Sequence, residues 1–114
     1  MSTDRITIEQ ASGHWVVRAG GAVLGESSDV LMLRETGYDP VAYFPREDIA
    51  ITFLDRTDRT TTCPYKGEAS YFSIVTKSTT LENVVWCYED PKSDVARIAG
   101  RLAFDTEHVT VEEV

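Results

Sequence analysis

The sequence has few of the residues that a metal centre or a disulfide framework would need. Of its 114 residues only two are cysteines, Cys63 and Cys87, and only two are histidines, His14 and His108. These four are widely spaced and form no CxxC or similar ligand pair, whereas a closed zinc site needs four convergent ligands. We therefore expect no metal and no cofactor. In a reducing compartment the two thiols should be free, with a reversible Cys63–Cys87 disulfide as the alternative.

Excess positive charge and long apolar runs are also missing. Eleven Lys and Arg stand against 19 Asp and Glu, for a net charge of −8 at pH 7. Such a chain repels phosphates, so we expect no nucleic-acid or membrane partner. Apolar runs such as residues 30–33 are too short to cross a bilayer, and the first five residues show no apolar signal-peptide core. These features predict a cytoplasmic protein, and its oligomeric state is left open.

What is present is an ordinary globular composition. Apolar residues make up 42% of the chain and charged residues 26%, close to the averages of soluble domains. No interior linker, internal repeat or low-complexity tract divides the sequence. We expect a single domain over residues 1–114, with its core at about 5–112.

Short runs of β-favouring residues separated by turn residues predict an all-β fold. The Gly20-Gly21 pair lies between the runs 14–18 and 22–24, which is a strong hairpin signal because tight primed turns need positive φ. Further strands are predicted at 6–8, 30–33, 41–44, 49–53, 69–75, 83–88, 101–104 and 109–111, with a polar loop over 55–62 that ends in a threonine-rich strand. Short helical turns are predicted near 45–49 and 93–98. This spacing is typical of a barrel or a two-sheet β domain.

Four segments in the middle of the chain occur together in a known family. They are YFPRED at 43–48, CPYKGEASY at 63–71, WCYEDP at 86–91 and GRLAF at 100–104. The ordered set resembles the domain-of-unknown-function 427 family over about residues 16–104. The resemblance implies a small tent-like β fold, grouped with B-type methionine sulfoxide reductases and the ligand-binding domain of cereblon. The family carries a nucleotidyltransferase label, but fold kinship transfers no chemistry by itself.

The turn at residues 63–67 contains the candidate nucleophile. Pro64 and Gly67 fold Lys66 back toward Cys63, and a nearby ammonium group can stabilise a thiolate. The sequence therefore offers Cys63 as a catalytic residue. The same pattern also fits a small core cysteine beside a lysine that pairs with a carboxylate. Neither histidine lies in a recognisable catalytic motif, so the sequence identifies no general base for Cys63.

Charged residues provide candidate ligand contacts. We predict that Glu35 or Asp48 binds a polar group and Lys66 an anionic one. Beside Lys66 and Arg18, the two acids could also bind a metal–phosphate group or act as acid and base. The same four could equally be an ion-pair network that stabilises the fold. There is no Asp-x-Asp pair for two metal ions and no P-loop, which argues against nucleotidyltransferase activity.

Aromatic residues gather in the same central region. We assign the phenylalanines to the core, whereas Trp86 and the tyrosines of this region carry polar groups and are better candidates for a pocket wall; these tyrosines are Tyr43, Tyr65, Tyr71 and Tyr88. Lys66 is predicted to lie within ion-pair reach of Glu35 or Asp48, with Trp86 or Tyr88 lining the same hollow.

The leading functional hypothesis is small-molecule binding in this aromatic and charged pocket. A thiol-dependent enzyme using Cys63 and a structural or interaction module are the alternatives. Whether any reaction is catalysed is left open.

Overall fold

Turn residues divide the chain into short strands, as the sequence predicts. The computed structural model describes residues 5–114. Within them the strands are β1 (Ile6–Gln10), β2 (Trp15–Ala19), β3 (Ala22–Ser27), β4 (Leu31–Glu35), β5 (Val41–Tyr43), β6 (Leu54–Cys63), β7 (Gly67–Val75), β8 (Thr80–Cys87), β9 (Leu102–Phe104) and β10 (Thr110–Glu113). The helical segments are three 3-10 helices, η1 (Arg46–Asp48), η2 (Ile51–Phe53) and η3 (Ser93–Ile98). The all-β prediction is confirmed.

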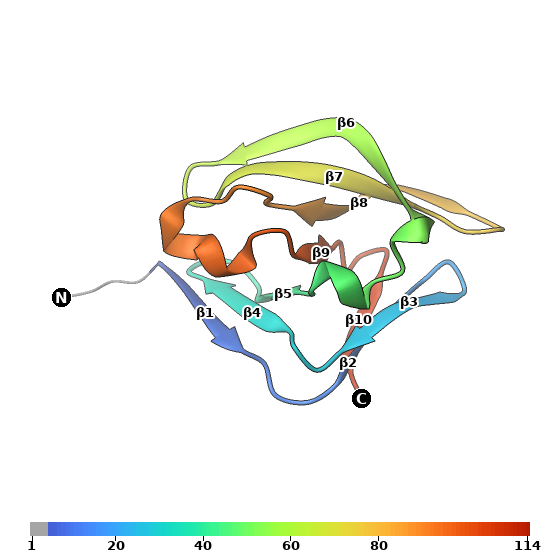
Figure 1. The fold of residues 1–114 in the computed structure, drawn as a ribbon, viewed down its shortest axis with the longest axis horizontal. Helices are drawn as coiled ribbons and strands as arrows, with labels where there is room; N and C mark the ends of the chain where they lie inside the picture. Colours follow the sequence, from blue (N-terminus) through green and yellow to red (C-terminus); the bar gives the residue numbers. More distant parts are fainter. Residues whose placement is uncertain (1–4) are drawn as a thin grey trace.

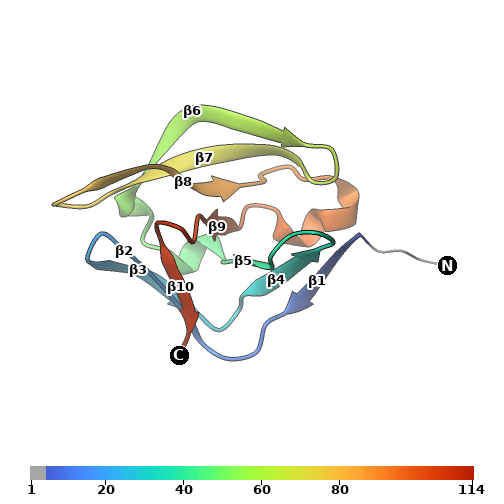
Figure 2. The same cartoon turned by 180° about the vertical axis from the view of Figure 1, so that it is seen from behind.

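The strands form three antiparallel sheets. The largest has the order β6-β7-β8-β9, and the two smaller ones have the orders β1-β4-β5 and β10-β2-β3. The four-stranded sheet lies across the top of Figure 1, and the two smaller sheets lie beneath it and converge toward the bottom of the view. Figure 2 shows the same arrangement from behind, with β10 running down beside β2 and β3. The three sheets together form a small tent-like domain.

The β2–β3 hairpin follows directly from its two glycines. Gly20 and Gly21 adopt φ values of +56° and +79°, and residues other than glycine rarely adopt two such values in succession. The strands pair up to Ala19 and Ala22, immediately beside this two-residue turn. This prediction is confirmed.

The four-stranded sheet is covered on both faces. Successive side chains of a strand point to opposite faces, and the buried residues accordingly form two clusters. One contains Phe44, Phe72 and Phe104, in which the rings of Phe44 and Phe104 pack edge to face at 5.8 Å. The other contains Tyr43, Tyr88 and neighbouring aliphatic residues. The second cluster forms the floor of the site described below.

Two segments differ from the sequence prediction. Residues 55–62, expected to be largely loop, belong to the ten-residue strand β6, because they pair with β7 despite their polar side chains. Residues 49–53 alternate like a strand, but Ile49 forms a single β-bridge, to Gly25, and residues 51–53 fold as the 3-10 helix η2, in which Ile51 is 54% exposed. None of the helices in residues 5–114 is long and apolar enough to span a membrane.

Candidate functional site

A pocket of about 490 Å³ opens where β4, β5, the β6–β7 turn and β8 meet. Six of its fourteen lining residues are aromatic and four are charged. The lining residues are Arg5, Leu33, Glu35, Tyr38, Asp39, Val41, Tyr43, Cys63, Pro64, Tyr65, Lys66, Tyr71, Trp86 and Tyr88.

Strand register explains why the aromatic rings gather there. Tyr71 of β7 lies directly opposite Trp86 of β8, so the two side chains leave the same face of the large sheet. From the facing sheet, Tyr43 of β5 approaches Trp86, whose indole Nε1 donates a hydrogen bond of 3.2 Å to the Tyr43 hydroxyl. This bond joins two sheets across the back of the pocket.

An ion pair lies beside the rings. Lys66 Nζ is 2.8 Å from Glu35 Oε1, and the two side chains are only 12% and 9% exposed. Arg5 Nε approaches the other oxygen of Glu35 at 3.5 Å, and its guanidinium stacks 4.3 Å from the centre of the Tyr65 ring. Glu35 is therefore held by two cations at the pocket rim.

The main chain holds Lys66 in place. Its amide donates to the carbonyl of Cys63, and its own carbonyl accepts from the Lys92 amide at 2.9 Å. Gly67 follows at φ +112°, a conformation that favours glycine. The turn thus fixes the backbone of Lys66 at a position from which its ammonium group reaches the pocket.

Burial changes the acid–base behaviour of two pocket tyrosines. Desolvation raises the pKa of Tyr43 well above its usual range, although the hydrogen bond from Trp86 opposes the shift. Desolvation also raises the pKa of Tyr88, with neighbouring Cys63 and Tyr71 adding to it. Both hydroxyls therefore remain protonated donors at neutral pH. Within residues 5–114 the Tyr88 hydroxyl has no protein partner, yet it is not a sealed unsatisfied group, so it is accessible to an occupant of the pocket.

The structure brings together most of the residues that the sequence singles out. Glu35, Tyr43, Cys63, Lys66, Trp86 and Tyr88 all line this pocket. The predicted Lys66–Glu35 proximity is confirmed, with Trp86 and Tyr88 in the same hollow.

Arg18 and Asp48 do not reach this pocket. Arg18 is exposed on β2, in a different sheet, where it pairs with Glu112 of β10. Asp48 ends η1, and the segment is fixed to β3 by the bridge between Gly25 and Ile49. Both placements depend on sheet assignments that local sequence does not reveal.

Sequence reasoning missed three lining residues, Arg5, Tyr38 and Asp39. Tyr65 and Tyr71, two of the tyrosines that the sequence offers as pocket candidates, do line it, and Tyr71 shares a face of β7 with the buried Ala69. For Arg5 no local signal exists, since its contact with Glu35 joins the start of β1 to the end of β4.

The two cysteines have different environments. Both are free thiols; Cys63 is half-buried in the pocket, whereas Cys87 is fully buried. Cys63 pairs with Gly67 and Cys87 with Ser70 on the shared strand β7, so they point to opposite faces of the sheet. This geometry excludes a direct disulfide in the folded state. A nucleophilic role for Cys63 stays a prediction.

No trio of His, Cys, Asp or Glu side chains converges as metal ligands would within the described part of the chain. The charged groups that line the pocket are two cations, Arg5 and Lys66, and two carboxylates, Asp39 and the Glu35 group that both cations contact.

Comparison with known proteins identifies the family of this chain. A search of curated proteins finds no match to the chain. A family model described as Domain of unknown function (DUF427), under the short name NTP_transf_9, matches residues 7–114. The matched residues cover every strand apart from Ile6, the first residue of β1, and every lining residue of the pocket apart from Arg5. Because the family model matches nearly the whole chain, the chain belongs to the DUF427 family.

Proposed function

We propose that this domain binds a planar small molecule in the pocket between Tyr43, Trp86 and Lys66. The observation that carries the proposal is the Lys66–Glu35 pair, held 2.8 Å apart and almost out of water against an aromatic wall. Removing both charges from water is costly, and an apolar pair of similar size often stabilises a fold as well or better. A charged pair beside a cavity can instead contribute to ligand binding, through those N–H donors of the lysine that the carboxylate does not use.

The donors that remain available define the ligand's chemistry. An ammonium group has three N–H donors, and Glu35 uses one from Lys66. The Tyr43 oxygen accepts from Trp86, which leaves its own proton to donate, and the Tyr88 hydroxyl is also available. Three donors from separate elements suit acceptor oxygens, such as those of a carbonyl or a carboxylate.

The shape of the pocket suits a ring. Its volume of about 490 Å³ falls in the usual range of roughly 300–1,000 Å³ for small-molecule sites. Aromatic side chains favour stacked or edge-on contacts with another π system. We infer a mono- or bicyclic planar ligand, its flat face on Trp86 or Tyr71 and its oxygens toward Lys66.

The test is a titration with planar aromatic and heteroaromatic carboxylates and amides, followed by Trp fluorescence and thermal shift. We expect at least one compound to stabilise the protein and to change the Trp86 signal, and Lys66→Met to weaken its binding by about tenfold or more, as loss of a charge-assisted hydrogen bond does. Lys77→Met is the matched control, because Lys77 is exposed in the β7–β8 turn.

Other outcomes would favour the competing hypotheses. If Lys66→Met lowers stability while no planar compound binds, the pair is structural and the domain is an interaction module. If a compound is converted to product and Cys63→Ser stops the conversion, the domain is a thiol-dependent enzyme. Equal binding to wild type and Lys66→Met would contradict the proposed site.

A further inference from the structure

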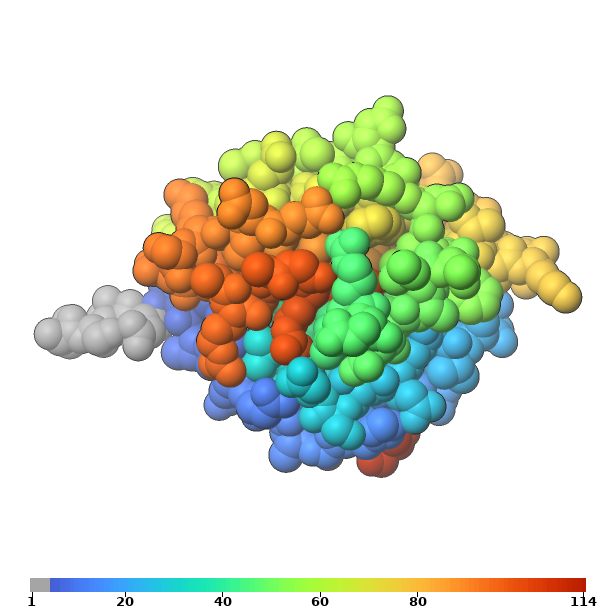
Figure 3. Space-filling model, viewed as in Figure 1, coloured from blue at the N-terminus to red at the C-terminus, as the bar shows by residue number. Residues whose placement is uncertain are grey.

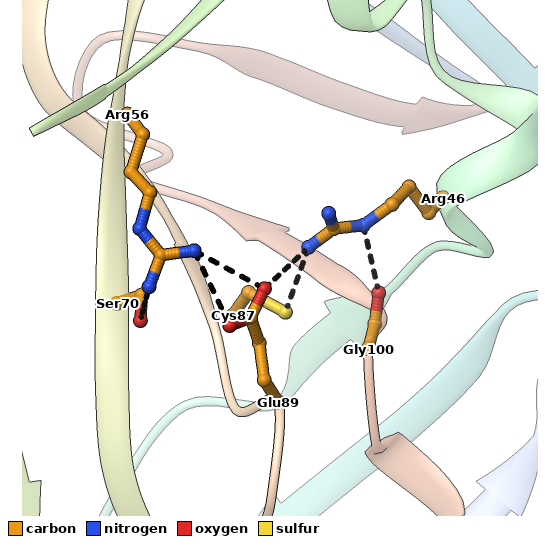
Figure 4. A network of polar contacts seen from close by, with 6 residues as sticks. All are labelled: Arg46, Arg56, Ser70, Cys87, Glu89 and Gly100. Atoms are coloured by element: carbon orange, nitrogen blue, oxygen red, sulfur yellow. Dashed lines mark hydrogen bonds and ion pairs between the residues drawn. The ribbon is translucent and has the colours of Figure 1, made fainter.

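A second charged cluster lies on the opposite face of the four-stranded sheet (Figure 4). Arg46 of η1 and Arg56 of β6 both bond Glu89: Arg46 Nη2 lies 3.3 Å from Oε2, and Arg56 Nη1 lies 3.2 Å from Oε1. Arg46 Nη2 also reaches the sulfur of Cys87, whose side chain points away from the pocket of Trp86. Two guanidinium groups thus face a single carboxylate, which leaves one positive charge in excess within a chain of net charge −8.

The two arginines also line a small hollow with an apolar floor. It has a volume of about 200 Å³, and its other lining residues are Ile51, Leu54, Phe72 and Leu102. The guanidinium carbons lie 5.7 and 6.0 Å from the centre of the Phe72 ring, so the same ring lies beneath both cations. In Figure 3 the green segment containing η1 and η2, the lighter green β6 and the orange segment after β8 meet on one face of the molecule.

We propose that this hollow binds a small amphipathic carboxylate. Its carboxylate would bond Arg46 and Arg56, and its apolar body would rest on Phe72 beside Ile51. The planar guanidinium of arginine matches carboxylate geometry. The chain already places the Glu89 carboxylate on Nη2 of Arg46 and Nη1 of Arg56, while Arg56 Nη2 donates to Ser70 Oγ and Arg46 Nε donates to the Gly100 carbonyl. Glu89 is thus an internal competitor that marks the chemistry of the external ligand.

Exposure makes this exchange feasible. The side chains of Arg46, Arg56 and Glu89 are 40%, 55% and 42% exposed, and ion pairs as exposed as these contribute little to stability. A ligand carboxylate can therefore displace Glu89 or bind beside it without disrupting the fold. The space available corresponds to roughly six or seven water-sized groups, which suits a molecule about as large as benzoate.

A purely structural role would leave two features unexplained. One carboxylate does not balance two arginines, and Ile51 remains 54% exposed at the rim of the hollow. An amphipathic anion would neutralise the excess charge and cover the apolar rim in a single binding event.

The experiment titrates the intact protein with benzoate, benzamide and inorganic phosphate, followed by amide chemical shifts and calorimetry. We expect saturable benzoate binding of about millimolar affinity at this hollow, seen as shift changes of η1, η2 and the Phe72 region that persist in Lys66→Met, a variant in which binding at the Trp86 pocket is weakened. Benzamide and phosphate should bind far more weakly, because one lacks the charge and the other lacks the apolar body.

Two variants report on the cluster from opposite directions. Arg56→Met should weaken benzoate binding by at least about tenfold, whereas Glu89→Gln should tighten it about two- to fivefold by removing the competitor. Arg34→Met is the matched control, because Arg34 forms a similarly exposed pair with Glu9 on another sheet. Lys66→Met should leave benzoate binding at this cluster unchanged, which separates it from the Trp86 pocket.

The proposal is overturned if benzoate causes no saturable shifts near Phe72, if benzamide or phosphate binds as tightly as benzoate, or if Glu89→Gln weakens binding or leaves it unchanged. Glu89 is exposed, so its variant is informative even if Arg56→Met folds poorly.

Discussion

At the scale of single residues, the Lys66–Glu35 pair joins parts of the chain that no sheet ladder connects. Glu35 ends β4 in one sheet, and Lys66 lies in the turn between two strands of another. Because Arg5 adds a second cation, the Glu35 carboxylate is compensated even though its side chain is only 9% exposed. The pair therefore has a structural consequence whether or not a ligand is bound.

Removing one partner of this pair should destabilise the domain. Breaking a buried ion pair typically costs about 3–5 kcal/mol, and because Arg5 stays beside Glu35, we expect Lys66→Met to cost about 1–3 kcal/mol of unfolding free energy. Urea denaturation measures the change. In a double-mutant cycle, Glu35→Gln with Lys66→Met should cost less than the sum of the single changes. Strict additivity would show that the two side chains are not energetically coupled.

Buried acidic groups predict a loss of stability at alkaline pH. Burial raises the pKa of Tyr43 and Tyr88 above the ordinary 10.0, and that of the Cys87 thiol above 9.0. The folded state thus keeps protons that the unfolded chain releases, so the unfolding free energy falls as pH rises past about 9, and more steeply past 10. Below pH 9 these groups contribute no pH dependence.

Urea denaturation between pH 8 and 11 measures this slope. Each such group contributes up to about 1.4 kcal/mol per pH unit, and Tyr88→Phe should reduce the slope above pH 10. Tyr38→Phe is the control, because Tyr38 is 68% exposed. A Tyr88→Phe profile parallel to that of the wild type would contradict the assignment.

At the scale of elements, the sequence predicts correctly those structures that depend on neighbouring residues in the chain. The β2–β3 hairpin follows from two adjacent glycines, and the all-β class follows from turn spacing. The η2 segment and β6 were mispredicted because their structures depend on neighbours. Polar β6 becomes a strand by pairing with β7, and the strand-like alternation around Ile51 ends in a 3-10 helix against the core.

Gly25 is an element-level constraint that composition does not reveal. It lies in β3 where η1 crosses, and a Cβ atom there would be 2.2 Å from the carbonyl oxygen of Asp48. Because that neighbour is a backbone atom, Gly25→Ala must displace η1. We expect the free energy of unfolding to fall by about 2–3 kcal/mol, near the upper end of the usual cost of overpacking.

Gly21→Ala provides the comparison for this prediction. Gly21 has positive φ but open space around its missing Cβ, so its substitution should cost only about 1–2 kcal/mol of backbone strain. Thermal or urea unfolding of both variants gives the comparison. A milder effect for Gly25→Ala than for Gly21→Ala would show that η1 yields easily.

At the scale of the whole molecule, the large sheet separates two environments. Its one face contributes Tyr71 and Trp86 to the proposed small-molecule pocket, and its other face contributes Phe72 and Cys87 to the arginine cluster. The sequence predicted several members of the pocket because their segments lie near turns and aromatic runs. It could not place Arg18 or Asp48, since their positions depend on which sheet each segment joins.

The same separation predicts how the two thiols react. Cys63 is half-buried in an open pocket, whereas Cys87 is fully buried beneath Arg46 and burial raises its pKa. Because the thiolate is the reacting species, a disulfide reagent such as DTNB should modify Cys63 in the native protein. Cys87 should react only as fast as the domain opens.

Single-cysteine variants assign the two phases of this reaction. Cys63→Ser should remove the fast phase and Cys87→Ser the slow one, and a ligand of the Trp86 pocket should slow only the fast phase. Mild oxidation with diamide should produce no intrachain disulfide in the native state, since the side chains leave opposite faces of one sheet. A native Cys63–Cys87 crosslink, or equal rates for both thiols, would mean that the sheet opens readily enough for the two environments to mix.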